Sequence, residues 1–305
     1  MAARKNGQRR EKKQKSMAPY SWLIALVLIA LYGLYLLVSG GIGGDSASTP
    51  SDGEELRVLF IDVGQADAAL VTCRGQSLLI DGGNVADSST VYTVLEKNGV
   101  THLNYIVCTH AHEDHVGGLS GALEACTAGT VYCPVTDYDS KAFRNFSRRV
   151  AEQNCDLTVP RAGETFALGG AEVEILACDP EAEDTNNTSI VLRVSYGETS
   201  FLFMADAETP VERELLDAGT DLSATVLKVG HHGSGTSTSY RFLNEVMPAY
   251  AVISVGKDNS YGHPDEAVLS RLEDAGARIL RTDELGDILF VSDGRTVTLP
   301  QIDGG

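Results

Sequence analysis

Six of the seven histidines in the chain fall in three short groups. The groups are His110/His112/His115, His231/His232 and His263. The first group reads H-x-H-x-D-H and directly follows the apolar run YIVC of residues 105–108. Imidazoles bind Zn, Fe and Mn, and a carboxylate adds a harder oxygen ligand. On an irregular loop His110 and His112 can converge on one cation, while Asp114 and His115 turn towards a second. Histidines with a purely structural use would not be grouped in this way at the end of an apolar strand.

Two other catalytic motifs are absent from the sequence. It contains neither the G-x-S-x-G of a serine nucleophile nor the G-x-x-x-x-G-K-[ST] of a phosphate-binding loop. The remaining hypothesis is metal-assisted hydrolysis. Two divalent ions, Zn or Mn, about 3.5–4 Å apart would activate a water and stabilise both the attacking and the leaving oxygen of an in-line displacement.

Apolar runs bounded by turn residues predict the elements that must position these histidines. Strands are expected at 56–63, 68–72, 77–80, 105–108, 131–133, 171–176, 189–195, 200–204, 224–229, 250–255, 278–281, 287–291 and 296–299. Helices are expected at 90–98, 117–126, 208–218, 239–246 and 265–275. Helices that appear singly between largely uninterrupted strands indicate an α/β (α+β) fold of two packed sheets with helices on both outer faces.

Eight segments, in order along the chain, resemble the metallo-β-lactamase superfamily and, more narrowly, the extracellular hydrolase-like domain of ComEC-like competence proteins. They are LFIDVGQADAALV (59–71), LLIDGG (78–83), YIVCTHAHEDHVGGL (105–119), NNTSIVLRV (186–194), FLFMADAE (201–208), LKVGHHGSGTSTS (227–239), VISVGKDNSYGHP (252–264) and RTDELGDI (281–288). The resemblance covers residues 56–299 and implies a four-layer αββα sandwich with a metal site at one edge. The permease part of ComEC-like proteins has no counterpart here, so we expect a single-span hydrolase rather than a DNA channel.

The resemblance also implies a set of metal ligands. His110 and His112 match the ligands of the first metal ion, and Asp114 and His115 match those of the second. Asp206, after the run FLFMA, matches the carboxylate that bridges both ions.

A later histidine should complete the second site. His231 and His232 are the best candidates because they follow an apolar strand, and His263 is either that ligand or a group that contacts substrate. Asp81 resembles the acid that holds a ligating histidine in its tautomer. Ordinary turn capping is the alternative role for Asp81.

The first metal site departs from the pattern of β-lactamases. No histidine lies between His115 and Asp206, so a third imidazole is missing there. ComEC-like sequences share this gap and carry an Asn-Asn-x-Ser segment nearby, here at 186–189. An amide or a water could fill the position, giving a harder site that prefers Mn²⁺. Ala66 and Ala205 stand where ComEC-like domains usually carry glycine.

Several residues are candidates for contacting water or substrate. Asp114 or Asp206 could orient the attacking water, and His232 or His263 could stabilise the developing oxyanion or protonate the leaving group. The candidates for substrate binding are Asn187, Lys228 and Ser234. For Lys228, a solvated lysine at a strand end is an equal alternative to phosphate binding.

The amino-terminal part of the sequence predicts a membrane anchor. Residues 1–19 are basic, with seven Lys and Arg among the first 15, and residues 20–38 carry no charge over a length of about 28 Å. Residues 39–55 are rich in Gly and Ser, as a flexible linker is. The positive charge before the span places the amino terminus in the cytoplasm and the hydrolase domain, residues 56–300, outside the cell membrane. A cleaved signal peptide is the alternative.

Six cysteines in an extracellular domain permit disulfides, whose pairing the sequence does not give. The absence of a C-x-x-C pair argues against a zinc site built from four cysteines. We expect the cysteines to be structural.

The charge of the chain bears on its substrate. Beyond residue 15 there are 17 basic and 41 acidic residues, a net charge of −24, which repels nucleic acid at long range. The resemblance favours phosphodiesters, with single-stranded DNA first. A small envelope phosphodiester, of the phosphocholine or teichoic-acid type, is the alternative that suits the charge. A non-catalytic, membrane-tethered binding module is a different kind of answer. No obligate protein partner is expected.

Overall fold

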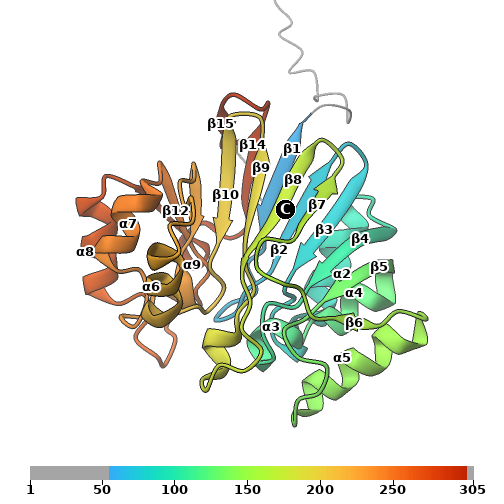
Figure 1. Ribbon diagram of the computed structural model, residues 1–305. Coiled ribbons are helices and arrows are strands. Elements are labelled where there is room, and N and C mark those ends of the chain that lie inside the picture. The colour runs from blue at the N-terminus through green and yellow to red at the C-terminus, as the bar shows by residue number, and fades with distance from the viewer. Residues whose placement is uncertain (1–54, 301–305) are drawn as a thin grey trace, which may run out of the picture. The chain divides into compact units, whose positions relative to one another are not determined.

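Two β-sheets pack face to face in the part of the chain that the computed structural model describes, residues 55–300 (Figure 1). The predicted basic segment and anchor lie outside the described residues, as does the linker up to residue 54. Within residues 55–300 no helix has both the length and the apolar character needed to cross a bilayer.

The first sheet has eight strands in the order β15-β14-β1-β2-β3-β4-β5-β6. Its strands are β1 (Leu56–Phe60), β2 (Ala69–Cys73), β3 (Gln76–Ile80), β4 (His102–Val107), β5 (Thr127–Tyr132), β6 (Leu157–Thr158), β14 (Ile288–Ser292) and β15 (Val297–Thr298). Strands β3 to β6 are parallel and the other pairs are antiparallel.

The second sheet has seven strands in the order β13-β12-β11-β10-β9-β8-β7. Its strands are β7 (Thr165–Leu168), β8 (Ala171–Ala177), β9 (Val191–Tyr196), β10 (Thr199–Phe203), β11 (Val226–Lys228), β12 (Tyr250–Ile253) and β13 (Arg278–Arg281). Strands β10 to β13 are parallel. The carboxyl ends of parallel strands meet at one edge of a sheet, which is where open α/β sheets place their ligands.

The core between the sheets is formed by alternate residues of the strands. Strand β1 is buried at every second position, as period-2 side-chain alternation requires. The ring of Phe60 stacks on Phe203 of the opposite sheet at 5.6 Å between centroids and meets Phe290 edge-on at 6.0 Å. Such aromatic pairs add about 0.5–1.5 kcal/mol each beyond the area they bury.

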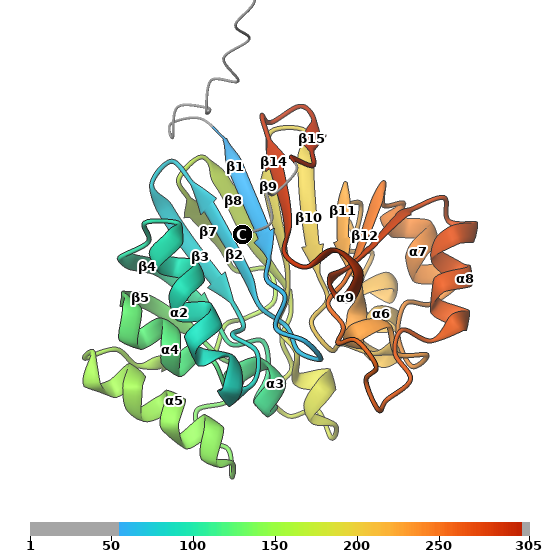
Figure 2. The same cartoon turned by 180° about the vertical axis from the view of Figure 1, so that it is seen from behind.

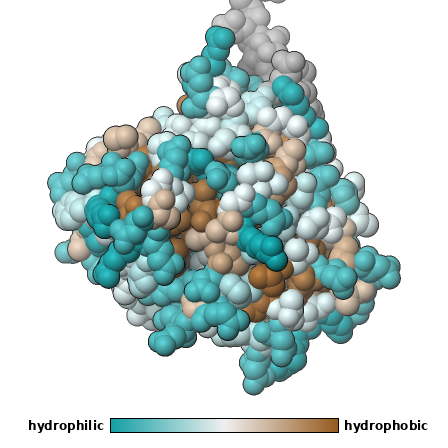
Figure 3. Space-filling model, viewed as in Figure 1, coloured by the Kyte–Doolittle hydropathy of each residue, from teal (hydrophilic) through white to brown (hydrophobic). Residues whose placement is uncertain are grey.

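Helices cover the outer face of each sheet, on opposite sides of the described part (Figures 1 and 2). The first sheet is covered by α2 (Ser88–Lys97), α4 (Leu119–Ala125) and α5 (Lys141–Glu152), and the second by α6 (Thr209–Asp217), α7 (Tyr240–Val246) and α8 (Glu266–Asp274). The short helices are α3 (Glu113–Val116) and α9 (Thr282–Leu285), with 3₁₀ turns η1 (Val85–Asp87), η2 (Thr185–Thr188) and η3 (Gly230–Gly233). The predicted αββα sandwich is confirmed. Figure 3 shows one face of it, largely hydrophilic, with hydrophobic residues gathered in smaller patches.

Candidate metal centre

The predicted ligands come from loops at one edge of both sheets. His110 and His112 follow β4, and Asp114 and His115 lie on α3, which begins directly after them. Asp206 follows β10 of the second sheet. The 3₁₀ turn η3, which holds the adjacent histidines 231 and 232, comes after the neighbouring parallel strand β11. The sandwich therefore brings together residues that lie far apart in the sequence.

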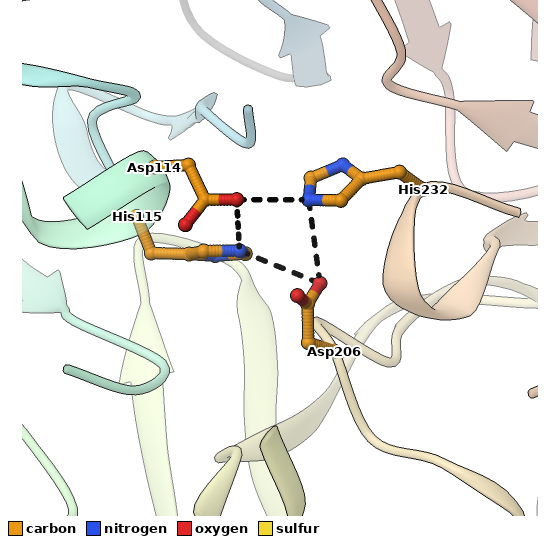
Figure 4. A group of neighbouring side chains, drawn as sticks. All are labelled: Asp114, His115, Asp206 and His232. Atoms are coloured by element: carbon orange, nitrogen blue, oxygen red, sulfur yellow. Dashed lines mark ion pairs between the residues drawn. The ribbon is translucent and has the colours of Figure 1, made fainter. Parts of the chain in front are cut away.

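Four side chains form a closed ring of contacts (Figure 4). Nε2 of His115 lies 3.4 Å from Oδ1 of Asp206 and 3.8 Å from Oδ2 of Asp114. Nε2 of His232 lies 3.6 Å and 3.4 Å from the same two oxygens. Zn–N and Zn–O bonds of about 2.0–2.2 Å put neighbouring ligand atoms of a tetrahedral ion roughly 3.3–3.6 Å apart. Three of the four contacts have that spacing, and the contact between His115 and Asp114 is longer at 3.8 Å.

The buried atoms of this ring have no hydrogen-bond partner among residues 55–300. They are Nε2 of His115, Nε2 of His232 and Oδ1 of Asp206, and their residues are no more than 2% exposed. Unpaired buried polar atoms are costly, so a native fold supplies them with a partner. A divalent cation bound between the four side chains would accept all of them as ligands, and the donor set of two imidazoles and two carboxylates fits such an ion.

The electrostatics of the ring favour charged groups. Burial alone would lower the pKa of His115, but the carboxylates of Asp206, Asp81 and Asp114 raise it well above its usual value. Burial would likewise raise the pKa of Asp206, yet His115 and His232 hold it well below its usual range. The pKa of Asp114 is lowered in the same way. The two carboxylates therefore remain ionised at neutral pH.

Hydrogen bonds behind the ring fix the orientation of its imidazoles. Oδ2 of Asp81 lies 2.8 Å from Nδ1 of His115, and Thr109 donates to Asp81 from its backbone amide at 2.8 Å and its hydroxyl at 2.7 Å. Nδ1 of His232 lies 2.9 Å from the carbonyl oxygen of Ser254. Both rings thus present Nε2 to Asp206. Asp81 lies where the resemblance places the acid that holds a histidine tautomer.

Lys228 does not have the surroundings expected of a phosphate-binding lysine. Its side chain is 4% exposed, and its ammonium lies 2.8 Å from Oδ2 of Asp67 and donates to the carbonyl oxygen of Val229 at 3.0 Å. A small cavity between the sheets is lined by Lys228, Asp67 and Ser254 among others. The charge of Lys228 therefore neutralises a buried acid of the protein itself.

The other candidates surround the ring. His231 approaches the second oxygen of Asp206, and its ring lies 5.7 Å from that of His263, centroid to centroid. Burial, His231 and His232 lower the pKa of His263. Oδ1 of Asn187 accepts a hydrogen bond from the backbone amide of Glu208 at 3.1 Å. Oγ of Ser234 is 2.9 Å from Oγ1 of Thr236.

Glu208 is a site residue that the sequence did not single out. Its Oε1 lies 3.1 Å from Nδ1 of His231 and accepts a hydrogen bond from Oγ1 of Thr236 at 2.7 Å. The sequence shows Glu208 only as a second acid two residues after Asp206. Its role became visible in the structure, where His231 lies beside it.

Comparison with known proteins identifies the class. Residues 61–257 match the family model described as the metallo-β-lactamase superfamily. The chain belongs to this superfamily, whose members are generally metal-dependent hydrolases.

Within the superfamily the chain is ComEC-like, as the sequence segments indicated. It is 34% identical over 275 residues to Competence protein ComA of Neisseria gonorrhoeae, covering 87% of this chain and 37% of that protein. It is 30% identical over 261 residues to ComE operon protein 3 of Bacillus subtilis, covering 79% and 33%. The chain thus spans about a third of the length of these relatives.

Solved structures show the same fold. The metallo-β-lactamase fold protein YhfI of Bacillus subtilis superposes with a TM-score of 0.53 at 14% identity, over 78% of this chain and 100% of that one.

Proposed function

We propose that the chain is a membrane-anchored, metal-dependent phosphodiesterase whose substrate is single-stranded DNA. The observation that carries the proposal is the ring of Asp114, His115, Asp206 and His232 with its unpaired, converging ligand atoms. The ring is reached from solvent on one side, because the side chain of Asp114 is 31% exposed. The similarity to competence proteins supports a nucleic-acid substrate.

Zinc or manganese ions bound by the candidate ligands would supply Lewis-acid stabilisation and a water that ionises near neutral pH. Asp114, the most exposed member of the ring, accepts a hydrogen bond from the attacking water and orients it. His263 lies beside His231, where burial and the neighbouring imidazoles lower its pKa, and its ring N–H can donate a hydrogen bond to a substrate oxygen. Asn187 and Ser234 remain proposed substrate contacts, whereas the ammonium of Lys228 is already paired with Asp67.

The location of the enzyme is part of the proposal. The uncharged span 20–38 would anchor it in the cell membrane with the basic segment 1–19 in the cytoplasm. The flexible linker 39–55 would then tether the hydrolase domain outside, without an obligate protein partner.

The test uses the full chain, purified in a mild detergent, with end-labelled single-stranded DNA and Mn²⁺ or Zn²⁺. We expect cleavage that a chelator abolishes. Removing a residue that only hydrogen-bonds to a metal ligand lowers activity about 10–100-fold. The Asp206→Asn variant removes a proposed ligand and should lose more activity than that. An Asp206→Asn variant as active as the parent protein would contradict the assigned site.

The net charge of −24 beyond residue 15 favours a second candidate, a small phosphodiester of the cell envelope. A protein that binds metal but leaves DNA intact should then hydrolyse a phosphocholine or teichoic-acid ester. A protein that binds neither metal nor these esters would be a tethered binding module instead.

A further inference from the structure

The carboxylate of Asp206 faces two different sets of imidazoles. Its Oδ1 lies 3.4 Å from Nε2 of His115 and 3.6 Å from Nε2 of His232, the pair of the ring described above. Its Oδ2 lies 3.9 Å from Nε2 of His110 and 3.6 Å from Nε2 of His231. The two adjacent histidines of η3 therefore approach opposite oxygens of one carboxylate.

The backbone of η3 directs the imidazoles of His231 and His232 towards different oxygens of Asp206. His231 has φ 49° and His232 has φ 52°, so two consecutive residues other than glycine occupy the left-handed region. Such residues cost about 1–3 kcal/mol each and occur mainly at functional sites, where the surrounding structure imposes them. Here the amide of His231 donates to the carbonyl oxygen of Ala205 at 2.8 Å, which ties η3 to the loop that carries Asp206. Ala205 is itself left-handed, with φ 49°.

The ring of His231 is also oriented from behind. Its Nδ1 lies 3.1 Å from Oε1 of Glu208, as Nδ1 of His115 lies beside Asp81 and Nδ1 of His232 beside the carbonyl oxygen of Ser254. In metal sites the ligating histidine usually donates its second ring N–H to a carboxylate or a carbonyl. His231 thus has the same arrangement as the two histidines of the ring, with Nε2 directed at Asp206.

Of the histidines after β4, His110 faces the same oxygen of Asp206 as His231, and His112 lies beside His110. Nε2 of His110 and Nδ1 of His112 are 3.1 Å apart, near the spacing of neighbouring nitrogen ligands on one ion. His110 is fully buried, so its Nε2 faces the other side chains of the site and not solvent.

We infer that His231 supplies the third imidazole of the first metal site, together with His110, His112 and Oδ2 of Asp206. The sequence leaves this position without a histidine between residues 115 and 206, and the structure provides one from beyond Asp206. Glu208 is the positioning residue of this imidazole. Three nitrogens and one oxygen form a softer donor set than two nitrogens, one oxygen and an amide or water. The site should therefore prefer zinc over the manganese that the sequence suggested. His232 belongs to the second site.

The inference rests on the metal dependence in the proposed function, but not on the substrate. The test is therefore metal binding by the full chain in detergent, stripped with a chelator and titrated with Zn²⁺. We expect two ions per chain in the parent protein, and one ion each in His231→Ala and His232→Ala. Glu208→Gln should keep both ions and bind one of them about 10–100-fold more weakly.

Two matched variants serve as controls. His263→Ala removes the neighbouring imidazole, and His102→Ala removes an exposed histidine on β4. Both should bind two ions with unchanged affinity. Circular dichroism of each metal-free variant checks that it is folded, and the visible absorption of bound Co²⁺ should lose the first-site bands only in His231→Ala.

Three results would overturn the inference: one ion or none in the parent protein, two ions of unchanged affinity in His231→Ala, or loss of the first ion in His263→Ala. A parent protein that binds two ions and loses one in His231→Ala, yet leaves DNA intact, would uphold the inference and refute the proposed nuclease.

Discussion

Lys228 and Asp67 form an ion pair that is almost completely buried between the sheets. Removing one partner of a buried pair leaves an uncompensated charge and costs about 3–5 kcal/mol. We therefore expect Lys228→Met to lower the free energy of unfolding by about that amount, measured by urea denaturation of the metal-free protein. Asp67→Asn, added to it, should recover part of the loss.

Lys257→Met is the matched control, because Lys257 is exposed and its loss should change stability by less than about 0.5 kcal/mol. Equal stability of the two single variants would show that the buried pair contributes nothing.

The sequence predicted that Lys228 binds phosphate or faces solvent, whereas it is buried and paired with Asp67. Side chains alternate between the two faces of a strand. In β11, Val226 faces the core between the sheets and Leu227 faces the helices, so Lys228 points inward like Val226. Treating the strand end as solvent-exposed overlooked this alternation.

The sequence predicted which residues are candidate metal ligands, but not which oxygen of Asp206 each histidine faces. The H-x-H-x-D-H segment fixes four donors by its spacing, and Asp206 was found by resemblance. The two adjacent histidines face different oxygens of Asp206 because His231 and His232 have left-handed backbone. The sequence did not reveal this conformation, because residues other than glycine rarely adopt it.

At the scale of elements, the junction of α3 and α4 is packed against the loop that follows β3. A Cβ atom on Gly118 would lie 1.8 Å from the carbonyl oxygen of Gly82, whose amide in turn donates to His115 at 2.8 Å. Gly118→Ala must displace one of these segments, at a cost of about 1–3 kcal/mol or more. Because the displaced loops carry Asp81 and His115, we expect weaker Zn²⁺ binding as well as a lower melting temperature.

Gly219→Ala is the control that distinguishes lower stability from weaker Zn²⁺ binding. Gly219 lies just after α6 in a left-handed conformation with open space around it, so alanine there costs about 1–2 kcal/mol of backbone strain. Zn²⁺ affinity should be unchanged. If Gly118→Ala also retained full affinity, the junction would not position the site.

Helix α5 is the one helix on the outer faces of the described sheets that the sequence did not predict, and the short strands β6 and β7 were not predicted either. The buried residues of α5, Ala142, Phe143, Phe146 and Val150, follow helical spacing, and Oγ of Ser140 caps the helix by accepting from the amide of Phe143 at 3.1 Å. Both signals were present in the sequence. They were overlooked because only three of the twelve residues are large and apolar. The other helices on the outer faces of the sheets were all predicted, each within a few residues of its observed bounds.

At the scale of the whole molecule, all six cysteines lie within the described residues and all are free thiols. The disulfides that an extracellular domain permits are not formed in this structure. Burial, with Cys133 and Asp179 nearby, raises the pKa of Cys178 to about 12. At pH 8 its thiolate fraction is therefore on the order of 10⁻⁴, and it should rise tenfold with each pH unit.

We expect six thiols per chain after denaturation without reductant, and slow alkylation of Cys178 in the native protein at pH 8. A reducing agent should leave the melting temperature unchanged. A mass below that of the fully reduced chain, together with a melting temperature that falls on reduction, would show that disulfides form.

The candidate metal centre draws its proposed ligands from both halves of the described part of the chain. Four of its side chains come from residues 110–115 beside the first sheet, and three from residues 206–232 beside the second, with about 90 residues between the groups. During synthesis, residues 110–115 leave the ribosome well before residues 206–232. Neither proposed site is complete until the second sheet has packed against the first. The proposed centre would therefore assemble late in the maturation of the chain, and the proposed activity would be absent from a nascent chain.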